Sequence, residues 1–343
     1  MKDEYPKSLV EAIRYFASPD VCVAFVKDMR WPDGAVCPQC GGKKVSYLST
    51  RRMFKCMAKD CHKQFSVKVG TIFEDSAVPL DKWLVAVWLV VNCKNGISSY
   101  EISRDLKVTQ KSAWFMLHRI RAALQDGTFE MMGGGGPVEV DEAYIGGAPK
   151  NRHLSQRMKT ARTVKNEKGD WVYNPEFREA RGRATKKTPV VGMIDREARR
   201  VRAQVIPEIE RKVLQDLILD NVSKGSKVFT DGLPEYKNLN AMGFVHDTVN
   251  HISEYVRGEV HTNGIENFWS LLKRGLRGTY IAVEPFHLDR YIGEQVFRFN
   301  NRATKDNPLD DRDRFMLAVS QISGKRLTYA ELTGKVGETA EPF

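Results

Sequence analysis

The chain has 343 residues and a formal net charge of +11, from 54 Lys or Arg against 43 Asp or Glu. This length predicts about two or three domains whose cores the 42% of apolar residues can fill, and the positive charge favours a polyanionic partner such as nucleic acid over a merely solvated basic surface. The longest strongly apolar run, residues 84–91, is far shorter than the roughly 20 residues of a membrane-spanning helix, so no membrane partner is expected.

Residues 1–30 form the first predicted element, an amphipathic helical segment in which Leu9, Ile13 and Phe16 recur at helical spacing. We expect it to be a packing element. The opening residues, MKDEYPKSLV, hold acids where a signal peptide has an apolar core, so the sequence predicts a soluble cytoplasmic protein.

Residues 31–75 contain four clustered cysteines, whereas Cys22 and Cys93 stand alone. The four are spaced as C-x2-C, fifteen residues and C-x4-C, which is typical of a zinc ribbon. A structural Zn²⁺ would stabilise a segment too small to bury a core by itself. His62 is an alternative fourth ligand, and chance clustering of reduced thiols is the alternative to any metal site. The predicted zinc ligands are Cys37, Cys40, Cys56 and Cys61.

Residues 76–130 are predicted to form a helix-turn-helix DNA-binding domain. An apolar helix over 78–92 is followed by a capping box, Ser98 with Glu101, that opens a second helix, and by Thr109, which can cap a third. The same pattern is compatible with helices that only pack in a core. If the pair binds DNA, the outer face of its last helix enters a major groove, and the residues predicted on that face are Gln110, Lys111, Ser112 and Arg119.

Four glycines at 133–136 mark the boundary of a further domain, predicted over 137–305. Beyond them the hydrophobic periodicity predicts the order β-β-β-α-β-α-β-α. The predicted elements are strands 138–145, 189–194 and 201–206, helix 208–222, strand 227–230, a short helix 236–242, strand 244–249 and helix 262–276. This is the succession of a ribonuclease-H-like fold, as in retroviral integrases, with a central mixed five-stranded sheet. The chain as a whole is then a multidomain protein of the α+β and α/β classes.

A basic insertion separates the first two of these strands. Residues 148–187 carry twelve Lys or Arg against four Asp or Glu, which is most of the excess positive charge. We expect the insertion, and two arginines near the end of helix 262–276, to contact DNA phosphates with an affinity that falls steeply with salt. The predicted contacts are Lys150, Arg152, Arg157, Lys159, Arg181, Arg183, Lys186, Lys187, Arg274 and Arg277. A helical tail is predicted over 306–343.

Three acidic residues stand where elements of this domain end or begin. Asp141 and Asp231 lie at the ends of predicted strands, and Glu266 lies in the first turn of helix 262–276. If the fold brings them together, their repulsion raises their proton affinity unless a cation binds, and hard oxygen ligands favour Mg²⁺ or Mn²⁺. Two such ions can drive phosphoryl transfer. The alternatives are solvated carboxylates and a simple capping box between Asn263 and Glu266.

The segments VDEAYIGG, VFTDGLPEY and HTNGIENFWSLLKRGLRGTY, with the cysteine pattern, resemble the zinc-ribbon-bearing bacterial insertion-sequence transposases of the DDE or DDNK class, the ISXO-like family. The resemblance spans nearly the whole chain. It implies that Asp141 and Asp231 are the first two catalytic acids and metal ligands, and that Lys273 is the trailing catalytic lysine. The third position is Glu266 or, as the alternative, Asn263, and the 35-residue spacing from Asp231 favours Glu266.

The resemblance implies a transposase that binds the terminal inverted repeats of its element, exposes 3′ hydroxyls by hydrolysis and joins them to double-stranded target DNA. It also implies a structural Zn²⁺, two catalytic Mg²⁺ or Mn²⁺ ions, and a homodimer or larger assembly that pairs two ends. Two other functions fit the pattern. One is a ribonuclease-H-like nuclease or resolvase that cuts without joining, and the other is a domesticated DNA-binding regulator whose acids are idle.

Overall fold

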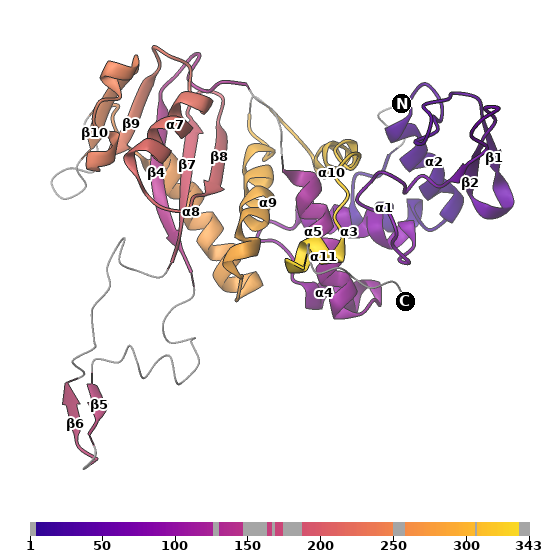
Figure 1. Ribbon diagram of the computed structural model, residues 1–343, viewed down its shortest axis with the longest axis horizontal. Coiled ribbons are helices and arrows are strands. Elements are labelled where there is room, and N and C mark those ends of the chain that lie inside the picture. Colours follow the sequence, from indigo (N-terminus) through magenta and orange to yellow (C-terminus); the bar gives the residue numbers. More distant parts are fainter. Residues whose placement is uncertain are drawn as a thin grey trace. The chain divides into compact units, whose positions relative to one another are not determined.

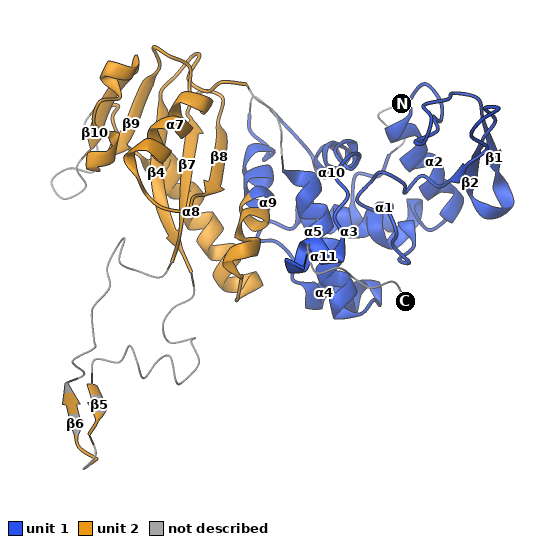
Figure 2. Cartoon of the chain, in the orientation of Figure 1, with its two compact units in different colours: residues 1–127, 293–343 blue, residues 128–292 orange. Residues whose placement is uncertain are grey.

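The computed structural model describes residues 5–125, 130–146, 163–166, 169–173, 187–249, 258–305 and 307–335. The chain divides into two compact units, drawn in separate colours in Figure 2: residues 1–127 with 293–343 form unit 1, and residues 128–292 form unit 2. Figure 1 labels the elements in chain order. Among the described residues no helix has both the length and the apolar character needed to cross a membrane.

Unit 1 begins with two helices and a small sheet. The predicted N-terminal helical segment contains two helices, because the chain turns at Ala17 and Ser18 and Pro19 then opens a second helix at a position where its missing N–H costs nothing. Three antiparallel strands follow in the order β1-β2-β3. The elements are α1 (Leu9–Tyr15), α2 (Pro19–Arg30), β1 (Val45–Leu48), the 3₁₀ turn η2 (Ser49–Arg51), β2 (Met53–Cys56) and β3 (Gln64–Phe65).

The remaining helices of unit 1 share one core with this sheet. The buried tryptophans Trp83 and Trp88 belong to the same hydrophobic cluster as Phe54 and Phe65 of the small sheet and Phe315 near the C-terminus. The segments predicted as separate N-terminal domains therefore fold as one unit. Its further helices are α3 (Leu80–Asn92), α4 (Ser99–Leu106), α5 (Gln110–Leu124), α10 (Asp311–Ser320) and α11 (Tyr329–Thr333).

The predicted helix caps in unit 1 are confirmed. Ser98 and Glu101 form a capping box at the start of α4, and the Thr109 side chain accepts a hydrogen bond from the Ser112 N–H at the start of α5. Each cap satisfies a backbone donor that a helix start otherwise leaves unpaired, which is why these two helices begin where the sequence predicts.

Helix α9 (Leu288–Asn300) crosses the division between the units, which falls at residue 293 and not at the predicted domain end at 305. The second half of α9 belongs to unit 1 because its side chains are buried there. Phe297 lies in the core of unit 1, and Glu294 pairs with Arg121 of α5 at 2.5 Å, with both side chains 1% exposed. Arg298 of α9 also pairs with Glu294.

Unit 2 contains the predicted mixed five-stranded sheet, in the order β10-β9-β4-β7-β8. On one side of the central strand β4, β7 is antiparallel to β4 and β8 is antiparallel to β7. On the other side, β9 is parallel to β4 and β10 is parallel to β9. The strands are β4 (Val138–Ile145), β7 (Thr188–Asp195), β8 (Arg200–Val205), β9 (Lys227–Asp231) and β10 (Val245–Val249). In the basic insertion, β5 (Thr163–Lys165) pairs antiparallel with β6 (Trp171–Tyr173).

Two helices, α7 (Arg211–Asn221) and α8 (Asn263–Gly275), cover opposite faces of this sheet. Alternate residues of a strand face opposite sides. Val140 of β4 packs in the cluster that holds Leu214 of α7, whereas its neighbour Asp141 accepts a hydrogen bond from Trp269 of α8. Unit 2 therefore has a three-layer arrangement with the sheet in the middle.

The predicted short helix over 236–242 is wrong. Two 3₁₀ turns, η5 (Pro234–Tyr236) and η6 (Asn240–Met242), take its place because Asn238 has a positive φ angle of 80°, which the interior of an α-helix does not allow. After α8 the chain continues through the π-helical turn η7 (Leu276–Tyr280) and the 3₁₀ turn η8 (Pro285–His287).

Candidate active site

Three carboxylates meet where strands β4 and β9 part. Asp141 and Glu142 are consecutive residues of β4, and Asp231 is the last residue of β9. One oxygen of each lies within 4.8 Å of the others. The pairing of the two strands ends at Val140 with Thr230, so beyond this point no ladder fills the space between them. The space between the two strands therefore gathers acidic side chains from both of them, and we call this site, formed by Asp141, Glu142 and Asp231, the acidic notch.

The surroundings of Asp141 oppose its ionisation. The side chain is half-buried, and its carboxyl group lies deep among protein atoms. This burial, and then the charge of Asp231, raises the pKa of Asp141 to about 6, while the hydrogen bond from Trp269 acts in the opposite direction. The negative charge of Glu266 adds to the rise. A bound cation would remove this penalty, so the electrostatics of the notch fit a metal site.

Gly192 of β7 lets α8 approach the sheet closely. It lies opposite Asp141 in the pairing of β4 with β7. A Cβ atom at this position would lie 2.6 Å from the Trp269 ring and 2.8 Å from Ile265, both on α8. Trp269 is buried, and its indole N–H donates to Oδ2 of Asp141 over 3.0 Å. The glycine therefore sets the distance between Asp141 and the helix that carries Glu266.

We predict that Gly192→Ala destabilises unit 2 by about 1 to 3 kcal/mol, because the rigid indole ring of Trp269 must move to admit the new methyl group. Urea unfolding followed by tryptophan fluorescence would measure the change. Gly278→Ala is the matched control, since a Cβ atom there meets nothing within 4 Å. An unfolding midpoint equal to that of the wild type for Gly192→Ala would contradict the close approach.

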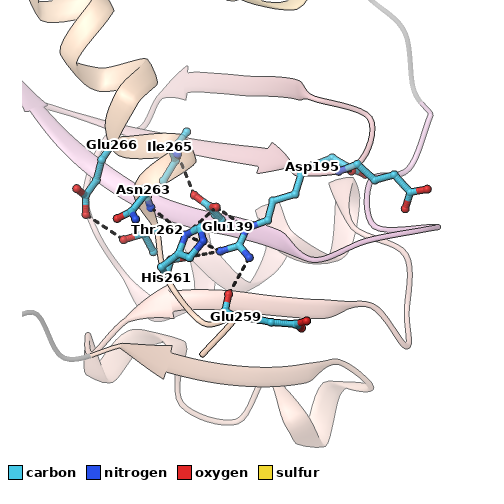
Figure 3. Close-up of polar contacts among 10 residues, drawn as sticks. Glu139, Asp195, Glu259, His261, Thr262, Asn263, Ile265 and Glu266 are labelled. Atoms are coloured by element: carbon cyan, nitrogen blue, oxygen red, sulfur yellow. Dashed lines mark hydrogen bonds and ion pairs between the residues drawn. The ribbon is translucent and has the colours of Figure 1, made fainter. Parts of the chain in front are cut away.

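A buried ion pair holds the start of α8, as Figure 3 shows. Glu139 of β4 is fully buried and accepts a hydrogen bond from the Ile265 N–H over 2.9 Å. Arg196 donates to Glu139 over 2.5 Å, and also to the backbone oxygens of Glu259 and His261, each over 2.7 Å. The carboxylate of Glu139 thus caps the helix from the neighbouring strand, which ties α8 to the strand of Asp141.

The predicted third position lies on this helix but outside the three-carboxylate cluster. Glu266 and Asn263 are both exposed. Thr262 is the N-cap residue of α8, and its hydroxyl donates to Oε1 of Glu266 over 3.0 Å. Asn263 is therefore the first residue of the helix, and the alternative of a capping box that begins at Asn263 is wrong. The structure brings Asp141 and Asp231 together, and Glu266 is near enough for its charge to act on Asp141.

Glu142 is the member of the cluster that the sequence did not predict. Strand alternation places it on the face of β4 opposite to Asp141, so the pattern alone separates the two side chains. The structure shows that both reach the notch because β9 ends one residue beyond its last pair with β4. The signal in the sequence was that Glu142 directly follows the predicted catalytic Asp141 in VDEAYIGG.

The four predicted zinc ligands are also brought together. The sulfur atoms of Cys37 and Cys61 lie 3.7 Å apart, those of Cys40 and Cys56 lie 3.5 Å apart, and all four lie within 4.8 Å of one another. Zinc–sulfur bonds of about 2.3 Å in a tetrahedron place sulfurs about 3.8 Å apart, so the four thiols fit Zn²⁺. Burial opposes ionisation of Cys37, but the backbone N–H groups that point at it outweigh burial and lower its pKa to about 7.

The prediction that Arg119 lies on the outer face of α5 is wrong. Its side chain is 3% exposed, and its guanidinium donates to the carbonyl oxygens of Leu327 and Glu74 over 2.9 and 2.7 Å. Helix α11 and the residues before it pack on this part of α5, where the ring of Tyr329 also contacts Phe115. Contacts between residues 208 positions apart have no signature in a local helical pattern.

The other predicted residues of α5 lie at its start. Gln110 is half-buried and donates to the Ser99 side chain over 2.9 Å. Ser112 is half-buried, and its N–H donates to the Thr109 hydroxyl at the cap. Lys111 is exposed, with its ammonium group 4.8 Å from the ring centre of Tyr329. Lys111 is therefore the residue of this group that offers an exposed charge.

The predicted phosphate contacts of unit 2 are described only in part. Lys187 and Lys273 are half-buried, and Arg274 and Arg277 are exposed at the end of α8 and just beyond it. The other predicted contacts lie outside the described residues: Lys150, Arg152, Arg157, Lys159, Arg181, Arg183 and Lys186.

Comparison with known proteins places these features in a family context. Residues 134–300 match the ISXO2-like transposase domain, and residues 17–64 match the transposase zinc-ribbon domain, which includes all four zinc-site cysteines. The chain is similar to an uncharacterized protein in transposable element ISH50 of Halobacterium salinarum, with 28% identity over 296 residues that cover 83% of this chain and 94% of the relative. An uncharacterized transposase-like protein of Haemophilus influenzae is 31% identical over 106 residues, which cover 31% of this chain and 85% of the relative.

A solved structure, the cryoEM structure of the simian T-cell lymphotropic virus intasome in complex with PP2A regulatory subunit B56 gamma, has a chain that matches with 10% identity. The match covers 64% of this chain and 70% of that one, with a TM-score of 0.30. A score this low carries no weight, so the family assignment depends on the two matched domains and on the two relatives.

Proposed function

The chain belongs to the ISXO2-like transposase family, and from this premise we propose that it cuts DNA at the ends of an insertion sequence and joins the freed 3′ ends to target DNA. The acidic notch where β4 and β9 part carries this proposal, because it lies within the matched transposase domain and gathers Asp141 and Asp231. The activity belongs in the bacterial cytoplasm, where the chromosome is.

We assign unit 2 a ribonuclease-H-like fold. Its central strand pairs on one side with an antiparallel hairpin and on the other with two parallel strands, which supports the order predicted from the sequence. In such a sheet the acidic ends of neighbouring parallel strands lie at one edge, where a phosphodiester can reach them. Helices α4 and α5 have the proportions of a helix-turn-helix, and we assign to the start of α5 a contact with the terminal inverted repeats.

The donor set in the notch fits Mg²⁺ or Mn²⁺, which prefer carboxylate oxygens. When bound, two such ions activate the attacking oxygen and stabilise the leaving oxygen of an in-line phosphoryl transfer. Asp141 is the central ligand in this proposal, since the charges of Asp231 and Glu266 act on it from a strand and from a helix. The indole of Trp269 fixes the orientation of its carboxylate. Glu266 is the third acid, with Asn263 as the alternative.

The basic residues bind and orient the DNA. Lys273, two turns beyond Glu266 on α8, is assigned a phosphate beside the cut, and the exposed Arg274 and Arg277 are assigned neighbouring phosphates. The basic residues of the insertion over 148–187 are assigned further phosphates. Such contacts release counterions, so the binding constant should fall steeply as salt concentration rises. Two ends must be cut together, so we propose a homodimer or larger assembly.

The test is to incubate the purified protein, with Mg²⁺, with linear DNA that carries the ends of its own element, and to score cut and joined products. The proposal predicts both products with the wild type and neither with Asp231→Asn. Asp216→Asn is the matched control, because it removes an exposed acid of α7 in the same unit. Cut products without joined ones would support a nuclease or resolvase. Repeat binding without either product would support a DNA-binding regulator.

A further inference from the structure

Glu142 lies in the acidic notch, but the three-acid arrangement proposed above does not use it. One of its oxygens lies within 4.8 Å of oxygens of both Asp141 and Asp231. Two oxygens that bind the same Mg²⁺ at about 2.1 Å lie about 3 to 4 Å apart, so small side-chain rotations would bring all three onto one ion. Glu266, by contrast, is not a member of this cluster.

The phenol of Tyr236 orients Glu142. Its hydroxyl donates to Oε1 of Glu142, and the ring is fully buried in the core that α7 forms with the sheet. Tyr236 lies in the turn that directly follows Asp231, where the Leu233 N–H donates to Oδ1 of Asp231 over 3.2 Å. The segment from Asp231 to Tyr236 thus provides one carboxylate of the cluster, that of Asp231, and the hydroxyl group that orients a second, that of Glu142. Hydrogen bonds of this kind orient carboxylates that bind metal ions.

The chemistry of the cluster indicates that the charge of Glu142 is needed. A glutamine could also accept the hydrogen bond from Tyr236, without adding a third negative charge beside Asp141 and Asp231. Like charges held this close raise the free energy of the folded protein unless a cation binds among them. A third carboxylate beside Asp141 and Asp231 therefore fits the role of a metal ligand.

We propose that Glu142 is a ligand of a divalent metal ion together with Asp141 and Asp231, and that Tyr236 is the positioning residue for it. This inference rests on the proposed metal-dependent function. All three ligands come from strands of one sheet, so this first ion site is complete without α8. The second ion then requires Glu266, which reaches the site from α8.

Titration of the full-length, zinc-loaded protein with Mn²⁺ in the absence of DNA, with free Mn²⁺ followed by electron paramagnetic resonance, tests this inference. We expect Glu142→Gln to weaken the tighter Mn²⁺ site at least about tenfold, and Tyr236→Phe to weaken it severalfold. Glu266→Gln should leave the tighter site unchanged and remove the weaker one. Asp216→Asn, which removes an exposed acid of α7 that is not a member of the carboxylate cluster, should change neither.

Thermal unfolding of the zinc-loaded proteins, without Mn²⁺ or Mg²⁺, separates ligation from a structural role. If Glu142 is a ligand, Glu142→Gln should unfold at the same temperature as the wild type or higher, since it removes a repulsive charge. A lower unfolding temperature with unchanged Mn²⁺ affinity would overturn the proposal. So would wild-type affinity in both Glu142→Gln and Tyr236→Phe. If the wild type itself bound no Mn²⁺, both this inference and the proposed metal-dependent function would be wrong. If only Glu266→Gln lost Mn²⁺ affinity, the role of Glu142 alone would be overturned.

Discussion

Replacing Asp141 with Asn should abolish cutting and joining of DNA and, at the same time, stabilise the zinc-loaded protein at neutral pH when Mg²⁺ and Mn²⁺ are absent. The lost metal ligand should lower the rate in Mg²⁺ by at least roughly a thousandfold, because metal ions provide several kcal/mol of transition-state stabilisation. The gain in stability arises because burial and Asp231 raise the pKa of Asp141 to about 6 in the folded protein, from 3.8, so its charged form is unfavourable there. A neutral amide avoids this cost, which is on the order of 2 to 3 kcal/mol.

The raised pKa of Asp141 also predicts how its effect on protein stability changes with pH. Between pH of about 4 and about 6, the folded protein keeps the Asp141 proton that the unfolded chain has released. The contribution of Asp141 to stability should therefore fall as pH rises through this window, so the stability that Asp141→Asn gains over the wild type should grow from about pH 4 to about pH 6. Urea unfolding of the zinc-loaded proteins, without Mg²⁺ or Mn²⁺, at a series of pH values measures both curves. Parallel curves for the two proteins would contradict the raised pKa, and strand transfer by Asp141→Asn in Mg²⁺ would contradict its role as a ligand.

Replacing Cys56 with Ser should release zinc and unfold the small sheet of unit 1. Cys56 is fully buried in β2, where its sulfur lies 3.5 Å from that of Cys40. Structural zinc sites contribute about 10 to 16 kcal/mol of apparent binding free energy, more than the sheet can replace by packing. Because Phe54 and Phe65 of the sheet share a core with Trp83, the loss should also lower the stability of the neighbouring helices.

Zinc content after dialysis and thermal unfolding measure this effect. Cys93→Ala is the matched control, since Cys93 is a half-buried thiol outside the four-cysteine group. It should retain one zinc ion per chain. A stoichiometric zinc content in Cys56→Ser, at an unchanged unfolding temperature, would show that the four cysteines do not hold a structural metal.

The parts of the fold that the sequence predicted well are those set by local chemistry. Strand β4 was predicted with its observed bounds because apolar and acidic residues alternate from Val138 to Asp141, close after a run of glycines. The Ser98 and Glu101 box and the Thr109 cap were found because each is a contact within three residues. The four cysteines were found because metal ligands must come from short, recognisable turns.

The parts that were missed depend on contacts between distant residues. Arg119 was placed outside because nothing near it in the chain reveals that the carbonyl oxygen of Leu327 covers it. Helix α9 was given wholly to the catalytic domain, although its second half, where Glu294 pairs with Arg121, belongs to unit 1. Glu142 was passed over because strand alternation separates it from Asp141, whereas the end of β9 lets both reach one notch.

The most direct test of the central claim, that metal ions held in the acidic notch contact the cleaved phosphate, replaces one non-bridging oxygen of that phosphate with sulfur. Mn²⁺ accepts a sulfur ligand better than Mg²⁺ does. The account predicts that cutting of one phosphorothioate isomer falls at least about tenfold in Mg²⁺ and recovers in Mn²⁺. Equal rates for the oxygen and both sulfur substrates in Mg²⁺, with no gain in Mn²⁺, would contradict it.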